Sequence, residues 1–321
     1  MPVHHDMPDP RPRVWIVTEA ADAAARDVAV RTLRHRLEAV WSELRGACGA
    51  RQAPERIHQL RVATRRSLAA IDAFEDLLPT RSRAWFAKWL RRIRRAAGDA
   101  RDLDVLTDRL RDAAVEVVTT CRSTAGRTAR RRLVAMLARQ RTASRRPVYE
   151  IREKLLAADW PGRVERLLDR VGHGRPGPPF ARYARRRLRP LAGRFFARAD
   201  RRLREADEIH RLRIEGKKLR YAIEIFAPVF PSRLVSRCQK ALESLQEHLG
   251  EFTDHAAAAE RLERWSRRQT DADDRTEIRE LRKAEESRAQ RARKTFTKWW
   301  SPTRRRSLRR RVERTLRRGT A

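Results

Sequence analysis

The sequence predicts an all-α protein made of two similar helical halves, and three observations support this prediction. Apolar or small residues recur at spacings of 3, 4, 3, 4 and 3 along residues 57–74, the pattern of an amphipathic helix packed in a bundle. Patterns typical of β-strands are almost absent. A shift of 152 residues aligns two stretches of more than forty residues without a gap, which predicts an internal repeat.

The predicted order of elements begins with a proline-rich arm at residues 1–17. Such segments bury too little apolar surface to offset the entropy lost on ordering, so we expect this arm to be disordered. The first helical half is expected at 18–171 and the second at 180–300. The linker between them, GHGRPGPP at 172–179, is the strongest turn signal in the chain. Shorter breaks between helices are expected at 46–54, at 78–80, near Gly98 and at 123–126.

The last predicted element is a basic tail at residues 301–321, where nine of the fifteen residues from 304 to 318 are arginines. Like charges along an isolated helix repel one another, so we expect the tail to be helical only in contact with an anion. Its composition does not discriminate between nucleic acid, an acidic membrane and other polyanions.

The charge of the chain indicates a polyanionic partner. The chain has 77 lysine and arginine residues against 42 aspartate and glutamate residues, which gives a formal net charge of +35. Such a charge repels itself, and a polyanion would relieve the repulsion. Only eight of the basic residues are lysines, so a codon bias towards arginine would also raise the count. Hydrophobic residues make up 40% of the chain, enough for a substantial core, which excludes a wholly disordered polycation.

The cysteines and the apolar segments bear on the cellular compartment. Cys48, Cys121 and Cys238 are odd in number and widely spaced, which favours a reducing compartment over a disulfide framework or a zinc site. No apolar run approaches the roughly 18 residues of a transmembrane segment. The first residues lack the apolar region of a secretory signal. We therefore expect a cytoplasmic protein with neither a metal nor a cofactor.

Two stretches combine an apolar helical face with a basic one, IHQLRVATRRSLAAIDAF at 57–74 and IHRLRIEGKKLRYAIEIF at 209–226. At about 100° per residue, His58, Arg61 and Arg65 lie within roughly 60° of one another and well over 100° from the apolar face. We call these three residues the first rim. The second rim consists of the residues that follow the same geometry in the second stretch, His210, Arg213, Lys217 and Arg220. One such face is often only solvated, but two in the same register favour an anion-binding surface.

The motifs resemble those of the CHAD family of all-helical domains. H-x-L-R-V-x-x-R-R at 58–66 and H-x-L-R-I-x-x-K-K at 210–218 are each followed by an apolar helix and a later G-x-x-x-D pattern. RDLDVL at 101–106 resembles the family's hairpin motif closely, and TDHAAA at 253–258 resembles it loosely. The resemblance covers roughly residues 18–300. It implies two pseudo-symmetric helical bundles around a basic central channel, with inorganic polyphosphate as the ligand.

Carried over by position, the resemblance implies a set of polyphosphate-binding residues. They are His58, Arg61, Arg65, Arg66, His210, Arg213, Lys217, Lys218 and Arg220. Leu68 stands where the family pattern has an arginine, matching Arg220, so we expect the first half to hold its ligand less firmly. Lys88 and Lys240 share a register in a lysine-poor chain, and we add them as secondary contacts. Arginine suits this ligand because its fork donates two parallel hydrogen bonds to phosphate oxygens.

The sequence favours a binding protein over an enzyme. It contains no glycine-rich phosphate loop, G-x-S-x-G or H-E-x-x-H motif. It also lacks the E-x-E-x-K signature of the triphosphatase domains often joined to this family. Asp102 and Asp104 could suggest a metal site, but we expect Asp102 to cap a helix or to pair with an arginine at the hairpin. We predict non-catalytic polyphosphate binding in the cytoplasm, including polyphosphate granules, with sequence-nonspecific nucleic-acid binding as the alternative.

Overall fold

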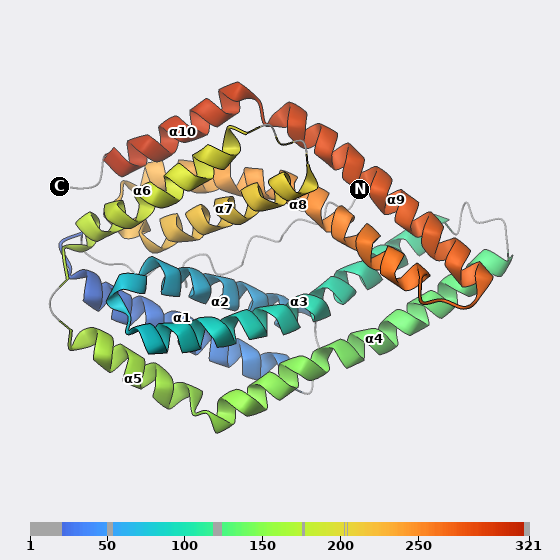
Figure 1. Ribbon diagram of the computed structural model, residues 1–321, viewed down its shortest axis with the longest axis horizontal. Coiled ribbons are helices and arrows are strands. Elements are labelled where there is room, and N and C mark those ends of the chain that lie inside the picture. The colour runs from blue at the N-terminus through green and yellow to red at the C-terminus, as the bar shows by residue number, and fades with distance from the viewer. Residues whose placement is uncertain are drawn as a thin grey trace.

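The computed structural model describes residues 21–49, 54–117, 124–174, 177–201, 203 and 205–317. Within these ranges the chain forms ten α-helices and two short 3-10 helices, with one isolated β-bridge and no β-strand (Figure 1). The all-α prediction is confirmed. The arm predicted at 1–17 lies outside the described residues.

The helices follow one another in two series. The first series is α1 (Ala25–Ala47), α2 (Pro54–Ala73), η1 (Glu75–Leu77), α3 (Thr80–Val117), α4 (Thr124–Ala157) and α5 (Trp160–Gly172). The second series is α6 (Phe180–Ala199), α7 (Ala206–Ile225), η2 (Ala227–Val229), α8 (Ser232–Ser266), α9 (Ala272–Trp299) and α10 (Pro302–Arg317). The bounds of α2 at 54–73 and of α7 at 206–225 differ by 152 at both ends. These bounds agree with the shift found in the sequence, while the repeat itself stays a prediction.

The apolar face predicted for each motif helix is buried. It consists of Ile57, Leu60, Thr64, Ser67 and Ile71 on α2 with Phe74 directly after the helix, and of Ile209, Leu212, Gly216, Leu219 and Ile223 on α7 with Phe226 directly after the helix. The buried hydroxyl group of Thr64 has a hydrogen-bond partner on its own helix, because it donates to the Leu60 carbonyl oxygen at 2.6 Å. Gly216 allows α8 to approach closely, since a Cβ there would lie 2.4 Å from Gln246 Nε2.

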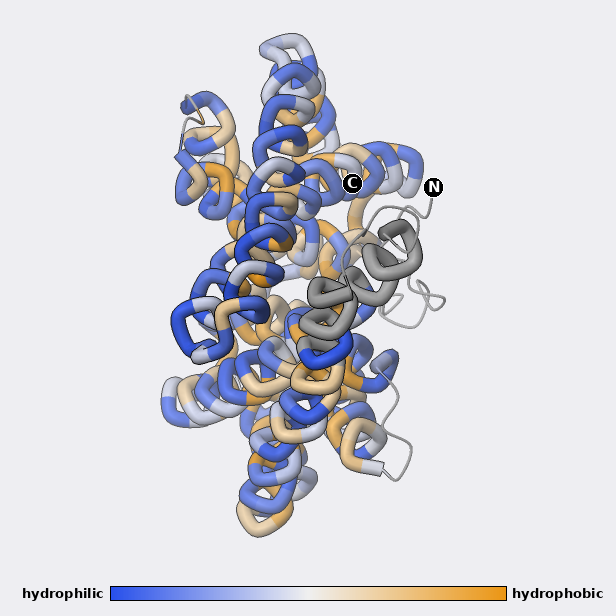
Figure 2. The backbone as a smooth tube through the Cα atoms, turned by 90° about the vertical axis from the view of Figure 1, so that its right-hand side faces the viewer, coloured by the Kyte–Doolittle hydropathy of each residue, from blue (hydrophilic) through white to orange (hydrophobic). Residues whose placement is uncertain are grey.

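One large hydrophobic core runs through both series, with Phe74, Tyr183 and Phe226 in mutual ring contact near its middle. A second, smaller cluster joins α3, α4, α8 and α9 towards one end, where it includes Leu106 and Leu262. Figure 2 shows hydrophilic residues over most of the outward-facing chain and hydrophobic residues between the packed helices. The long helices α8 and α9 lie side by side, and α4 contacts α9, so the second series meets the first at this end (Figure 1).

The break expected near Gly98 is wrong. Helix α3 runs without interruption from Thr80 to Val117, and the corresponding Gly250 lies inside α8. The predicted hairpin motifs are therefore mid-helix segments. A glycine costs about 1 kcal/mol in a helix interior, and burial of apolar residues on both sides of Gly98, such as Ile93 and Leu103, outweighs that cost. The breaks expected at 46–54, 78–80 and 172–179 are confirmed, and α4 begins at 124, inside the stretch expected at 123–126.

The expectation of a tail that lacks helical structure on its own is also wrong. Residues 302–317 form α10, which packs on α6 and α8 (Figure 1). Leu308 and Val312 are buried, and Arg309 Nη2 donates to Asp200 Oδ2 at 2.5 Å. A narrow apolar stripe, interleaved with arginines, is enough to dock the helix. None of the described helices combines the length and apolar character needed to cross a membrane.

Candidate functional site

The two motif helices, α2 and α7, lie side by side at the centre of the molecule (Figure 1). Arg66 Nε on α2 lies 3.1 Å from Glu224 Oε1 on α7. Further along α2, the carboxyl group of Asp72 interacts electrostatically with Lys218. The partner residue moves from 224 back to 218 as α2 advances, so the helices run antiparallel. The two rims therefore approach the contact between the helices from opposite ends.

Four cations from both rims gather where the helices meet. Lys217 is half-buried, and burial holds the pKa of its ammonium group well below the ordinary value. Arg213, Arg65 and Arg220 lower this pKa further, and Asp254 opposes them. Because these arginines act on one ammonium group, the structure brings cations of the first rim and the second rim together. We call Arg65, Arg213, Lys217 and Arg220 the central cluster.

A buried tyrosine lies beneath this cluster and was missed in the sequence analysis. Tyr221 accepts a hydrogen bond on its hydroxyl oxygen from Arg220 Nη2 at 3.3 Å, and the Arg220 guanidinium lies 4.8 Å from its ring centroid. Burial alone would raise the pKa of this phenol, yet the pKa is lowered because Arg65, Arg220 and Arg66 surround it. The positive potential of the cluster thus extends into the protein interior. The only signal in the sequence for Tyr221 was its position one residue after Arg220.

Arg66 points inward and does not belong to the central cluster. Its Nε and the Nη2 of Arg36 on α1 both lie 3.1 Å from Glu224 Oε1, and all three side chains are buried. Burial lowers the pKa of Arg36, and Glu224 opposes this shift. These three residues, the buried triad, join α1, α2 and α7. Removal of one member would leave an uncompensated charge in the interior.

The outermost motif arginines are held by the two G-x-x-x-D segments. Arg61 Nη1 donates to the Gly98 carbonyl oxygen and to Asp102 Oδ1, each at 3.2 Å. Arg213 Nη2 lies 3.8 Å from Asp254 Oδ1. The expected pairing of Asp102 with an arginine is confirmed, although it occurs in mid-helix. Arg261 on α8, which the sequence analysis missed, also contacts Asp102, with 3.3 Å between Nη2 and Oδ2.

The other expected residues lie around this arrangement. His58 is half-buried in the first turns of α2, and His210 is exposed in the first turns of α7. Lys218 Nζ donates to Glu215 Oε1 on its own helix at 2.8 Å. Lys88 on α3 and Lys240 on α8 are exposed. Asp104, for which no ion pair was predicted, is buried and pairs with Arg141. Leu68, in the register of Arg220, is buried.

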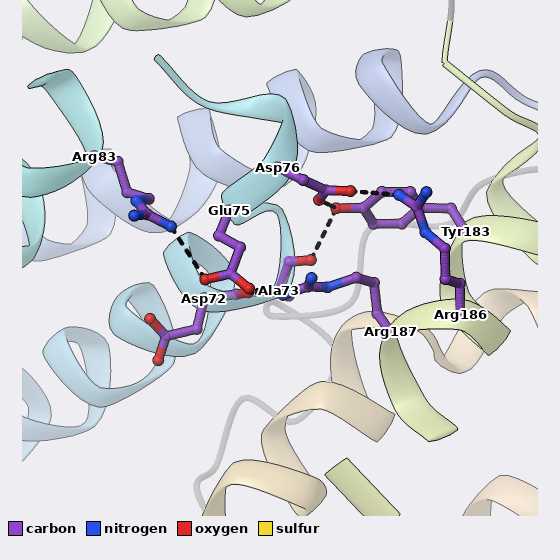
Figure 3. Close-up of polar contacts among 8 residues, drawn as sticks. All are labelled: Asp72, Ala73, Glu75, Asp76, Arg83, Tyr183, Arg186 and Arg187. Atoms are coloured by element: carbon purple, nitrogen blue, oxygen red, sulfur yellow. Dashed lines mark hydrogen bonds and ion pairs between the residues drawn. The ribbon is translucent and has the colours of Figure 1, made fainter. Parts of the chain in front are cut away.

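A second polar network fixes the end of α2 to α6 (Figure 3). The Tyr183 hydroxyl donates to the Ala73 carbonyl oxygen at 3.0 Å and to the Asp76 carboxylate. Arg187 Nη2 donates to the Asp72 carbonyl oxygen and to Glu75 Oε1, each at 2.7 Å. Burial and the bond to Asp76 raise the pKa of Tyr183. In Figure 3 the Asp72 carboxyl group points away from these contacts. This network holds the first series against the second without using the rims.

Two grooves lie elsewhere on the surface. One of about 510 Å³ runs between α6 and α10, where Phe196 and Leu316 line it together with Arg189. Another of about 410 Å³ lies between α4 and α9, next to Met136 and Ile278. Rim residues line neither groove. The central channel implied by the family resemblance stays a prediction.

Comparison with known proteins gives the family. The crystal structure of the CHAD domain from the plant Ricinus communis matches with a TM-score of 0.69 and 21% identity, covering 94% of this chain and 96% of that chain. PptA from Streptomyces chartreusis matches with a TM-score of 0.58 and 17% identity, covering 87% and 99%. These likenesses establish the fold. No curated protein matches the sequence. The CHAD domain family model matches residues 31–263, well over half of the chain, and the protein therefore belongs to the CHAD family.

Proposed function

We propose that this protein binds inorganic polyphosphate through its two rims and does not hydrolyse it. The observation that carries the proposal is the central cluster, in which Arg65 from the first rim and Arg213 and Arg220 from the second all act on the ammonium group of Lys217. Cations held together in this way repel one another, and a bound anion removes that repulsion. Membership of the CHAD family supports the same ligand.

The shape of the basic surface favours an extended anion over a single phosphate. Each rim runs about 10 to 15 Å along its helix at roughly 1.5 Å per residue. The antiparallel packing of α2 and α7 places the rims one after the other, so together they extend over roughly 20 to 30 Å. A linear chain of phosphates would engage both rims at once, and arginine forks would bind its oxygens in pairs.

The surroundings of the cluster favour polyphosphate over nucleic acid. Proteins that hold single strands stack the bases on accessible aromatic rings. Tyr221, the aromatic residue in contact with the cluster, is buried and pairs with Arg220. The acids beside the rims, Asp102, Asp254 and Glu243, face arginines. We therefore assign them no role as a base, which is the basis for proposing binding without hydrolysis. Cytoplasmic polyphosphate granules are the location we propose, and imaging of the tagged protein tests it.

The test is a charge reversal in the second rim with a matched control. Each charge-assisted contact to phosphate contributes roughly 1.5 to 3 kcal/mol. Arg213→Glu combined with Lys217→Glu should therefore weaken polyphosphate binding by several orders of magnitude in calorimetric titration. Arg310→Glu with Arg314→Glu makes the same change of charge at the same spacing on exposed positions of α10. We expect this control to bind almost normally.

Two results would contradict the proposal. One is normal binding by the double variant of the second rim together with loss of binding by the α10 control. The other is displacement of polyphosphate by single-stranded DNA or RNA at equal phosphate concentration, which would favour the nucleic-acid alternative. Circular dichroism of each variant checks that the helices are retained. Affinity should also fall steeply with salt, because binding releases counterions as it does on DNA.

A further inference from the structure

The two G-x-x-x-D segments place a carboxylate against the same motif position in each half. Arg61 Nη1 lies 3.2 Å from Asp102 Oδ1, and Arg213 Nη2 lies 3.8 Å from Asp254 Oδ1. Both members of the second pair follow the first by 152 residues, from 61 to 213 and from 102 to 254. Two contacts in the same register of the sequence favour a shared purpose.

These pairs are open to solvent. The side chains of Asp102 and Asp254 are 50% and 55% exposed, whereas those of Arg61 and Arg213 are 25% and 22% exposed. Ion pairs this exposed add little to stability, so the fold does not require them. Each carboxylate instead lies where a bound anion would lie, beside the guanidinium group of a rim arginine.

A carboxylate in this position affects a phosphate ligand in two ways. Asp102 accepts from an Arg61 N–H group that a phosphate oxygen would otherwise accept from, and the negative charges of Asp102 and Asp254 both repel the ligand. Asp102 acts on two arginines, because its second oxygen lies 3.3 Å from Arg261 Nη2. A short phosphate that reaches Arg61 or Arg213 alone must displace a carboxylate for a small gain. A long chain also contacts the other cations of both rims.

We infer that Asp102 and Asp254 are built-in competitors that occupy Arg61 and Arg213 in the empty protein and lower its affinity for phosphates. The inference rests on the proposed function, because the ligand is taken to be polyphosphate. Its consequence is that tripolyphosphate, which is too short to contact the full length of both rims, binds weakly, while long chains still bind and can be released. The carboxylates thus set the affinity of the same site.

Asparagine variants of the full-length protein test the inference. Asp102→Asn and Asp254→Asn keep the side-chain shape and a carbonyl acceptor and remove the charge. Each should bind tripolyphosphate and long-chain polyphosphate about two- to fivefold more tightly, and the double variant about tenfold, since exposed pairs of this kind are weak. Asp169→Asn on α5, an exposed residue, makes the same change in net charge away from the rims and should bind like wild type.

Each outcome separates this inference from the proposed function. Equal or weaker binding by the double asparagine variant, with wild-type protein that binds polyphosphate, would overturn the inference alone and show that the carboxylates position the arginines. An equal gain in Asp169→Asn would also overturn it, because net charge would then explain the effect. Wild-type protein that fails to bind polyphosphate would overturn the proposed function and the inference with it. Thermal unfolding of the variants should match wild type.

Discussion

The two motif helices share one pattern but use their last turns differently. On α7, Glu224 is buried between Arg36 and Arg66. On α2 the residue in the same register, Asp72, is exposed and interacts with Lys218 on α7. The acid on α7 is thus part of a buried ionic contact, and the acid on α2 is a surface charge. The comparison teaches that two acids in the same register of similar motifs can differ, one holding helices together and the other remaining accessible.

The two rims also differ in the number of cations that they contribute to the central cluster. The second rim adds Arg220 to the central cluster, while the first has the buried Leu68 in that register. The amine Lys217 also belongs to the second rim, where the first has Arg65. The second half therefore contributes three of the four cations in the central cluster, and the first half contributes both arginines of the buried triad.

The largest effect on stability should come from the buried triad. Glu224→Ala leaves Arg36 and Arg66 as buried charges without their acid, and we expect it to lower the free energy of unfolding by about 3 to 5 kcal/mol. Asp72→Ala, the change in the same register of α2, removes only an exposed charge and should cost less than about 1 kcal/mol. Chemical denaturation of both variants measures the difference. Equal losses of unfolding free energy in the two variants would show that Glu224 and Asp72 contribute equally to stability.

The helices that close the two halves offer the next comparison. Helix α5 buries Leu167 and Leu168, and α10 buries Leu308 and Val312 despite its arginines. Leu308→Ala should therefore cost about 2 to 5 kcal/mol, similar to Leu167→Ala, because both create a cavity in packed surroundings. Removal of residues 302–321 should lower the melting temperature markedly. An unchanged melting temperature would mean that α10 does not dock in solution.

The difference between the rims should appear in affinity. Arg220→Leu gives the second rim the residue type found at Leu68 and removes one contact to phosphate. We expect binding of long-chain polyphosphate to weaken about 10- to 100-fold, which corresponds to roughly 1.5 to 3 kcal/mol. Arg310→Leu on α10 is the control for loss of one exposed arginine. An effect of Arg220→Leu no larger than that of the control would place the ligand elsewhere.

The smallest expected effect is a dependence on pH that belongs to the second rim. Burial and the neighbouring arginines lower the pKa of Lys217 in the empty protein, and bound phosphate should raise it. Binding then takes up a proton above the lowered pKa, so affinity should fall as pH rises through it, by up to about tenfold for each pH unit. Lys217→Arg should abolish this decline.

The sequence predicted what depends on local periodicity. The buried face of α2 follows from the spacing of residues such as Ile57 and Ile71, and the rims follow from about 100° per residue. Periodicity places Arg66 about 100° from Arg65 around α2. It does not reveal that α7 lies on that side, because this depends on how the helices pack. The Arg36–Glu224 contact joins residues 188 positions apart, which no local pattern encodes.

The errors have the same origin. Gly98 was expected to end a helix because glycine lowers helix propensity, and contacts made by the rest of α3 outweigh that preference. The docking of α10 depends on a stripe that includes Leu308 and Val312, hidden within a segment of high charge, and on acceptors such as Asp200 that belong to a distant helix. The Tyr183–Asp76 contact likewise appears only when α6 meets the end of α2.

The most direct test of the central claim is a crystal structure of the protein with bound polyphosphate. We expect a chain of phosphates along α2 and α7, with oxygens within hydrogen-bond distance of Arg65, Arg213 and Lys217, and with Arg61 released from Asp102. Phosphates seen only along the arginines of α10, with Arg61 still on Asp102 and the central cluster empty, would contradict it.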